Sequence, residues 1–313
     1  MTLLIEESAS STQEKTRKVR GKVRLREHLM GWLFVGPFGI VFLALLIAPL
    51  GYALYLSLWQ KKLIGGTSFV FLGNYVKAFT DPTFLSGVWF VVRFSLVAIP
   101  LQILVALAMA LIVDAVTSLF TRFSRLMIFL PYAIPTVIGA VMWGFLYSKS
   151  FGPLTDIFGL FGAPAPDFFS KNLIFYGLIN VVTWQWAGYY MIILYAALQG
   201  IDPSLYEAAR MDGASSWQIA LRIKIPLIAP ALLLILVFSL IGTLQFFNEP
   251  QILRYLAAGT IAPGFTPNMY AYQQAFGLAN FNYGSAISFA LGGVVFVCVY
   301  AFLFFTRKRR SFF

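Results

Sequence analysis

Apolar segments long enough to cross a lipid bilayer dominate this chain of 313 residues. A helix needs about 20 apolar residues to cross the hydrocarbon core. Apolar runs of that kind occur near residues 30–58, 89–114, 125–147, 173–198, 226–248 and 283–306. Because 59% of the residues are hydrophobic and only 11% are charged, the chain is too apolar for a soluble globule of its length. We therefore predict an all-α membrane protein with six transmembrane helices.

The basic residues indicate which side of the membrane each loop faces. Lysines and arginines gather before the first run, between the second and third, between the fourth and fifth, and after the sixth. The other loops carry only Lys61, Lys62, Lys77, Lys149, Lys171 and Arg254. Since loops rich in lysine and arginine remain in the cytoplasm, we expect both termini to be cytoplasmic. This distribution explains the net charge of +11 without a nucleic-acid partner.

The polar stretches are too short for a separate soluble domain. We expect a cytoplasmic basic arm over residues 1–29, one transmembrane domain over 30–306 and a cytoplasmic basic tail over 307–313. The arm is hydrophilic and contains several acids, so it lacks the apolar core of a secretory signal.

The third apolar run contains two prolines, Pro131 and Pro135. Each removes a hydrogen bond from a helix, and their spacing of four places them on one face. Prolines are ordinary in membrane helices, but kinks at these positions would also suit a helix that helps to open and close a central cavity.

The polar interruption between the fourth and fifth runs carries the local signals of a helix, a turn and a second helix. Asp202 suits an N-cap and is followed by a proline at the first helical position, where the missing N–H costs nothing. Gly213 stands where a helix C-cap needs a positive φ. Ser215 or Ser216 then caps the second helix, which Pro226 limits.

The first of these helices has a surface suited to a protein partner. Ala208 and Ala209 give a low-relief face, and the carboxylate of Glu207 offers a charged anchor beside it. Asp212 in the last turn opposes the helix dipole, so its charge does not serve the helix itself. The alternative is that Glu207 and Arg210 form an ion pair on a solvated loop helix.

Glu207-Ala208-Ala209, followed by Gly213, Ile223 and Pro226, resembles the EAA signature of the membrane subunits of ATP-binding cassette importers. The resemblance covers most of the chain after residue 30 and is closest in style to the carbohydrate-uptake branch. It implies a coupling segment over 202–225 that docks in a groove of an ATPase. The coupling residues that it implies are Glu207, Ala208, Ala209, Arg210, Asp212 and Gly213.

The same resemblance implies the partners: a second homologous permease subunit, two ATP-binding cassette ATPase subunits and an extracytoplasmic solute-binding protein. This chain has no phosphate-binding loop of the G-x-x-x-x-G-K-[ST] type, so we expect ATP and Mg on the partner ATPases and no cofactor here. A single histidine, His28, and a single cysteine, Cys298, far apart in the sequence, exclude a zinc site or a Cys-His nucleophile. We therefore expect no catalytic or metal-binding residues and no enzyme activity.

Polar and aromatic residues within the fourth and fifth runs are the candidates for a solute path. Aromatic faces stack on sugar rings, and amides bind paired hydroxyls. The candidates are Trp184, Gln185, Tyr189, Gln245, Asn248 and Glu249. Since neighbouring helical positions point different ways, only some of them can face a cavity. The others would pack between helices or form interhelical hydrogen bonds.

The sequence thus predicts the permease subunit of an importer in the bacterial inner membrane, for a mono- or oligosaccharide. The first alternative is the same importer type for another polar solute such as glycerol phosphate. The second is an ion-coupled secondary transporter, which normally places acids near the bilayer midplane. Ionisable residues within or beside the runs are scarce, and Arg93, Asp114 and Glu249 all lie near the ends of their runs. The third alternative is a membrane scaffold without transport activity.

Overall fold

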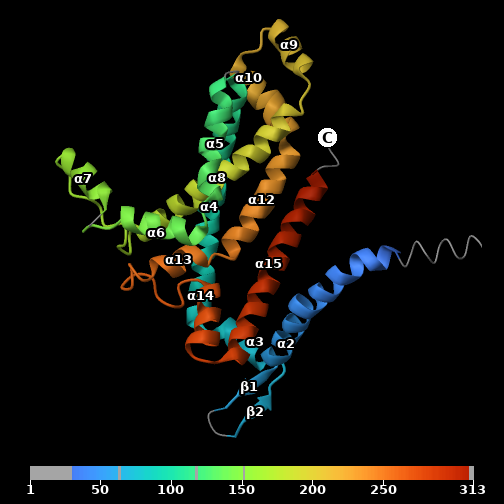
Figure 1. The fold of residues 1–313 in the computed structure, drawn as a ribbon, viewed down its shortest axis with the longest axis vertical. Coiled ribbons are helices and arrows are strands. Elements are labelled where there is room, and N and C mark those ends of the chain that lie inside the picture. The colour runs from blue at the N-terminus through green and yellow to red at the C-terminus, as the bar shows by residue number, and fades with distance from the viewer. Residues whose placement is uncertain (1–29, 63–64, 117–118, 151, 310–313) are drawn as a thin grey trace, which may run out of the picture. The chain divides into compact units, whose positions relative to one another are not determined.

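The computed structural model describes residues 30–62, 65–116, 119–150 and 152–309, and helices form most of it (Figure 1). The expected basic arm over 1–29 lies outside the described residues, as does the end of the expected tail. The chain divides into two compact units, residues 1–56 and 57–313, which are described separately.

The first unit contains all but the last residue of one apolar helix, Met30–Ser57, whose final part is α2 (Ala48–Ser57). A π-helical turn, η1 (Leu43–Ile47), precedes α2, and the N–H of Ala48 bonds to the carbonyl of Leu43. The wider turn stands directly before Pro49, whose ring would crowd an α-helical carbonyl four residues earlier. A helix that is apolar on all sides suits a lipid environment.

The second unit begins with a small hairpin and two helices. Strand β1 (Trp59–Lys61) pairs antiparallel with β2 (Thr67–Phe69). Helix α3 (Gly73–Thr80) and the 34-residue α4 (Pro82–Ala115) follow. At about 1.5 Å per residue, α4 is roughly 50 Å long, more than a bilayer core requires. Asp81 caps its first turn and also accepts hydrogen bonds from the hydroxyls of Tyr270 (2.6 Å) and Tyr283 (2.9 Å).

The third apolar run is broken into two helices. Helices α5 (Leu119–Ala133) and α6 (Thr136–Leu146) meet at an angle of 95°. The break falls at Ile134 and Pro135, because Pro135 has no N–H with which to continue the helix and keeps the preceding residue extended. We expected one span here with kinks at its two prolines. The structure instead has a sharply bent pair of helices, and Pro131 lies inside α5 without breaking it.

The remaining helices complete the second unit. They are α7 (Pro153–Leu160), α8 (Ile174–Gln199), α9 (Pro203–Met211), α10 (Ser216–Ile219), η2 (Ala220–Lys224), α11 (Ile225–Leu227), α12 (Ala229–Leu244), α13 (Asn248–Leu253), α14 (Pro267–Tyr272), η3 (Gln273–Gly277) and α15 (Phe281–Arg309). Among the described residues, five helical stretches are long and apolar enough to cross a membrane, and the bent pair would make a sixth. Helices α9 and α10 lie at one end of this unit, and the hairpin and α3 lie at the other (Figure 1).

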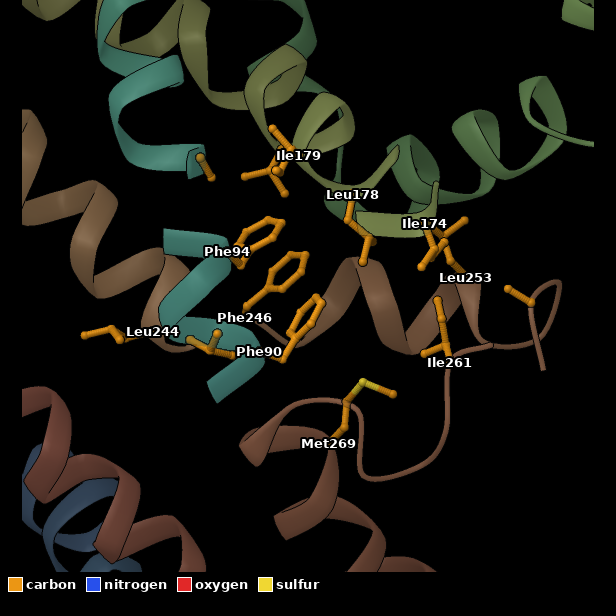
Figure 2. Packing of buried hydrophobic residues seen from close by; sticks show 14 of the residues in the cluster. Phe90, Phe94, Ile174, Leu178, Ile179, Leu244, Phe246, Leu253, Ile261 and Met269 are labelled. Carbon is orange, nitrogen blue, oxygen red and sulfur yellow. The ribbon is translucent and has the colours of Figure 1, made fainter. Parts of the chain in front are cut away.

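Helices α4, α8 and α12 form the centre of the second unit. Figure 2 shows its aromatic core, in which Phe94 of α4 stacks on Phe246 at a ring distance of 4.5 Å. On its other side, α8 touches the bent pair so closely at Gly188 that an added Cβ would overlap the carbonyl oxygen of Ile128. Small residues that let two backbones approach are typical of helix packing in membranes.

Candidate functional site

The segment 202–225 contains two helices, α9 and α10, and both ends of α9 are capped. The carboxylate of Asp202 accepts a 2.9 Å hydrogen bond from the N–H of Ser204 at the start of α9. At the other end, Gly213 has a φ of +80°, and the N–H of Ala214 bonds to the carbonyl of Ala209. This is a Schellman ending, which satisfies carbonyls that a helix end leaves open. Gly213 thus has the positive φ that a C-cap at this position needs.

A capping box begins α10. Ser215 Oγ accepts from the N–H of Gln218, and Gln218 Oε1 accepts from the N–H of Ser215. The second helix ends at Leu227, one residue beyond the proline that we expected to limit it. It accommodates the proline through the π-helical turn η2, in which the N–H of Ile225 bonds to the carbonyl of Ala220. A π-helical turn closes its hydrogen bond over five residues, which gives the backbone before the proline more room than an α-helical turn does.

The two most exposed large apolar side chains of this segment lie beside its turn. Met211 is 88% exposed and Trp217 is 70% exposed, and they flank the turn between the helices. Glu207, Ala208, Arg210, Asp212 and Gly213 are also exposed, and Ala209 is half-buried. The structure shows no ion pair between Glu207 and Arg210, both of which it describes. The segment therefore exposes apolar and acidic side chains on the same stretch of chain.

A second feature is a cavity of about 210 Å³ between α4, α6, α8 and α12. Its polar lining comes from Gln102, Thr136, Tyr190, Ser239, Thr243, Gln245, Asn248 and Glu249. Its aromatic lining is Trp186, Phe238, Phe246 and Phe247. No lysine or arginine is found among the described residues that line it. The lining thus combines amides, hydroxyls, one carboxyl group and aromatic rings.

Hydrogen bonds connect the walls of this cavity. Ser239 Oγ donates to Gln102 Oε1 at 2.6 Å, and Ser95 Oγ donates to Thr243 Oγ1 at 2.9 Å, so α12 is joined to α4 twice. The amide nitrogen of Gln102 is buried and has no partner among the described residues. A buried donor without a partner is costly unless a ligand or water binds it.

Only three of the six predicted solute-path residues line the cavity: Gln245, Asn248 and Glu249. Trp184 packs edge-on against Trp143 of α6, and Tyr189 stacks on Tyr132 of α5 at 4.4 Å. Gln185 donates 3.2 Å hydrogen bonds to the carbonyl of Ile134 and to Thr136. These three side chains therefore contact the bent pair, and Gln185 hydrogen-bonds the carbonyl next to Pro135.

The face of α8 that lines the cavity carries different aromatic residues. Trp186 and Tyr190 are four residues apart and hence on one face, and their rings stack at 6.0 Å. Sequence reasoning did not select these two, nor Gln102 and Ser239. For Gln102 and Ser239 the sequence does carry a signal. Each is a polar residue deep within an apolar run, and such residues normally face a protein interior.

The described residues contain no cluster of three or more histidine, cysteine, aspartate or glutamate side chains that could hold a metal ion. Cys298 is a free, exposed thiol.

Comparison with known proteins identifies the family. Residues 102–308 match the model of the binding-protein-dependent transport system inner membrane component. The lactose transport system permease protein LacF of Rhizobium radiobacter is 32% identical over 89% of this chain and 94% of its own length. The sn-glycerol-3-phosphate transport system permease protein UgpA of Salmonella typhimurium is 31% identical, over 80% of this chain and 85% of its own.

A solved structure supports the fold. The crystal structure of a bacterial ABC transporter involved in the import of alginate contains a chain that matches with a TM-score of 0.79 and 24% identity. The match covers 92% of this chain and 99% of the other. The protein described here belongs to the family of binding-protein-dependent transport system inner membrane components and is a membrane permease subunit of an importer.

Proposed function

We propose that this chain is one of two related permease subunits of a bacterial ATP-binding cassette importer that takes up a mono- or oligosaccharide. An extracytoplasmic binding protein delivers the solute, and two separate ATPase subunits bind ATP and Mg and hydrolyse the ATP. Residues 30–306 form the transmembrane domain, with basic segments 1–29 and 307–313 and both termini in the cytoplasm. The distribution of lysine and arginine along the chain supports this orientation.

The lining of the cavity is the observation that carries the choice of solute. Trp186 and Tyr190 offer ring faces, while Gln102, Gln245 and Asn248 offer amides, a combination that suits a neutral polyol. The lactose permease among the relatives agrees with this choice. The glycerol-phosphate permease raises the alternative of a phosphorylated solute. The described cavity lining has a carboxyl group and no cation, which disfavours an anion there.

The capped 202–225 segment is the docking element for the ATPase in this proposal. Met211 and Trp217 insert into a groove of the partner, Glu207 pairs with a cation there, and Ala208 permits close approach. Closure of the ATPases on nucleotide then displaces the segment, and the spans change from inward-facing to outward-facing. Arg210 and Asp212 lie on the same exposed surface, and Gly213 sets the angle between the two helices.

The experiment is a solute screen on the purified binding protein, followed by ATPase measurements on the complex reconstituted with this chain. We expect a mono- or oligosaccharide to bind and to stimulate ATP hydrolysis and uptake. Stimulation by glycerol phosphate and not by any sugar would contradict the choice of solute. Uptake by this chain alone, driven by an ion gradient without ATP, would favour the secondary transporter instead.

A further inference from the structure

One carboxylate on α4 contacts both ends of the 202–225 segment. Asp114 Oδ2 accepts from Nζ of Lys224 at 2.5 Å, and Asp114 Oδ1 accepts from Nε2 of Gln199 at 2.7 Å. Gln199 is the last residue of α8, three positions before the segment begins at Asp202, and Lys224 is the last residue of η2. The chain leaves the helical body and returns to it beside the same side chain.

The pair is well shielded from solvent although it lies at the end of the helices. The side chain of Asp114 is 9% exposed and that of Lys224 is 16% exposed. Tyr206 of α9 covers it, with its ring centre 4.9 Å from Nζ of Lys224. Burial, and then the negative charge of Asp114, raise the pKa of Tyr206. The first helix of the segment is therefore in electrostatic contact with α4 as well.

A shielded ion pair is weak evidence for stability, because desolvation opposes the attraction between the charges. Its better supported effect is to fix one arrangement of the groups around it. Here each carboxylate oxygen of Asp114 accepts one hydrogen bond. One comes from Gln199, before the segment, and the other from Lys224, near its end. The ion pair between Lys149 and Asp167 differs, since its side chains are 55% and 45% exposed and its N–O distance is 3.2 Å.

The path from this contact to the cavity runs along one helix. Asp114 and Gln102 both belong to α4, about 18 Å apart at about 1.5 Å per residue. Gln102 lines the cavity and bonds to Ser239 of α12. A displacement that reaches Asp114 therefore reaches the wall of the cavity through a single rigid element.

We propose that Asp114 is a positioning residue for transport, which holds both ends of the 202–225 segment to α4 so that the segment and α4 move together. This role rests on the proposed docking of the segment to an ATPase. Without the ion pair, the segment still docks on the ATPase, but it moves relative to α4 at its junctions with the spans. ATP is then hydrolysed without uptake of solute.

The test compares Asp114→Asn and Lys224→Met with the charge swap Asp114→Lys/Lys224→Asp, in the complete complex and at equal membrane levels. Lys149→Gln, which breaks the exposed ion pair, is the control. We expect both single variants to lower the solute imported per ATP hydrolysed at least tenfold, with the ATPase still bound. We expect the swap to recover part of this ratio and Lys149→Gln to leave it unchanged.

A distance measurement separates this role from a merely structural one. In a Cys298→Ser background, spin labels at Ile112 of α4 and Ser216 of α10 report whether the segment and α4 move together. We expect the distance to stay constant on nucleotide binding in the parent protein and to change in Asp114→Asn. A constant distance in both proteins, or an unchanged uptake-to-hydrolysis ratio, overturns the proposal.

A crosslink between the segment and the ATPase distinguishes the two failures. If the crosslink forms and the ratio is unchanged in Asp114→Asn, only the role of Asp114 is wrong. If the parent protein gives no crosslink in any nucleotide state, the docking itself is wrong, and the role of Asp114 falls with it.

Discussion

Ser239 on α12 donates a 2.6 Å hydrogen bond to Oε1 of Gln102 on α4, across 137 residues of sequence. The bond satisfies the amide oxygen and leaves the buried amide nitrogen of Gln102 without a partner among the described residues. Because Gln102 also lines the cavity, the proposed function makes this nitrogen a donor for a solute hydroxyl.

Gln102→Leu should therefore weaken solute transport. We expect KM for uptake to rise roughly fivefold to tenfold, the effect of losing one hydrogen bond of about 1 kcal/mol. The matched control is Gln185→Leu, since Gln185 hydrogen-bonds the bend beside Pro135 and does not line the cavity. That variant should lower thermal stability and leave KM unchanged. Equal KM values for Gln102→Leu and the parent would remove Gln102 from the solute path.

The turn between α9 and α10 gives a second prediction. Gly213→Val should abolish uptake, because a β-branched residue is strained at a φ of +80°. Gly213→Asn should retain much of it, since asparagine tolerates the left-handed region. Both are compared at equal membrane levels by uptake and by stimulated ATPase activity. If valine and asparagine behave alike, the angle of this turn does not matter for transport.

Loss of an exposed apolar side chain at the turn should weaken ATPase binding. Trp217→Ala and Met211→Ala should each weaken it by about 2 kcal/mol, roughly 30-fold, as expected for central residues of an interface. Leu160→Ala is the control, because Leu160 on α7 is 85% exposed and lies outside the proposed docking surface. The measurement is a titration of the permease in nanodiscs with the ATPase subunit. Unchanged affinity in both variants would place the docking surface elsewhere.

The contact between α5 and α8 gives a prediction about stability. Gly188→Ala places a Cβ against the Ile128 carbonyl and should cost about 1–3 kcal/mol by forcing the helices apart. In Gly292→Ala the new Cβ has no described atom within 4 Å, and the added helix propensity should make it neutral or slightly stabilising. Thermal unfolding in detergent compares the two, and equal midpoints would contradict the close packing at Gly188.

The cap of α4 should make stability sensitive to acid. Burial acts to raise the pKa of Asp81, but hydrogen bonds from Tyr270 and Tyr283 outweigh it. Bonds from the amides of Thr83 and Phe84 add to them, so the pKa of Asp81 lies below its ordinary 3.8. A lowered pKa means that the stabilisation is present above pH 3.8 and is lost as the pH falls through the lower, folded-state value.

We therefore expect unfolding temperatures to fall on acidification below about pH 4, more steeply for the parent than for Asp81→Asn, which cannot ionise. A series of thermal scans between neutral and acidic pH measures both slopes. Parallel slopes would show that Asp81 contributes nothing to the acid sensitivity.

Much of the fold follows from local sequence signals. The apolar runs identify the long helices, and Asp202, Gly213 and Ser215 form the predicted caps because capping depends on a few neighbouring residues. The bend at Pro135 was foreseeable as a kink, but its angle of 95° depends on what α6 packs against. Near Pro226 the helix ends at Leu227, one residue later than the local rule predicts, and the π-helical turn before it was not predicted.

The cavity was harder to derive. Residues 184–190 are all apolar, aromatic or amide in character, and the sequence does not state which side of α8 faces α12. That choice depends on the contact at Gly188 with α5, which turns Gln185 and Tyr189 toward the bent pair and Trp186 and Tyr190 toward the cavity. Contacts between residues that are distant in the sequence determine which face of α8 lines the cavity. A single sequence does not reveal those contacts.

The π-helical turn at 220–224 has a consequence for the length of the chain. It holds one residue more than an α-helical turn, so the helix before it is rotated by about 100° relative to an uninterrupted helix. A single-residue deletion in this turn would swing Trp217 to a different side while leaving its chemistry intact. Chain length in this stretch, and not only its composition, therefore determines where the indole of Trp217 is aimed.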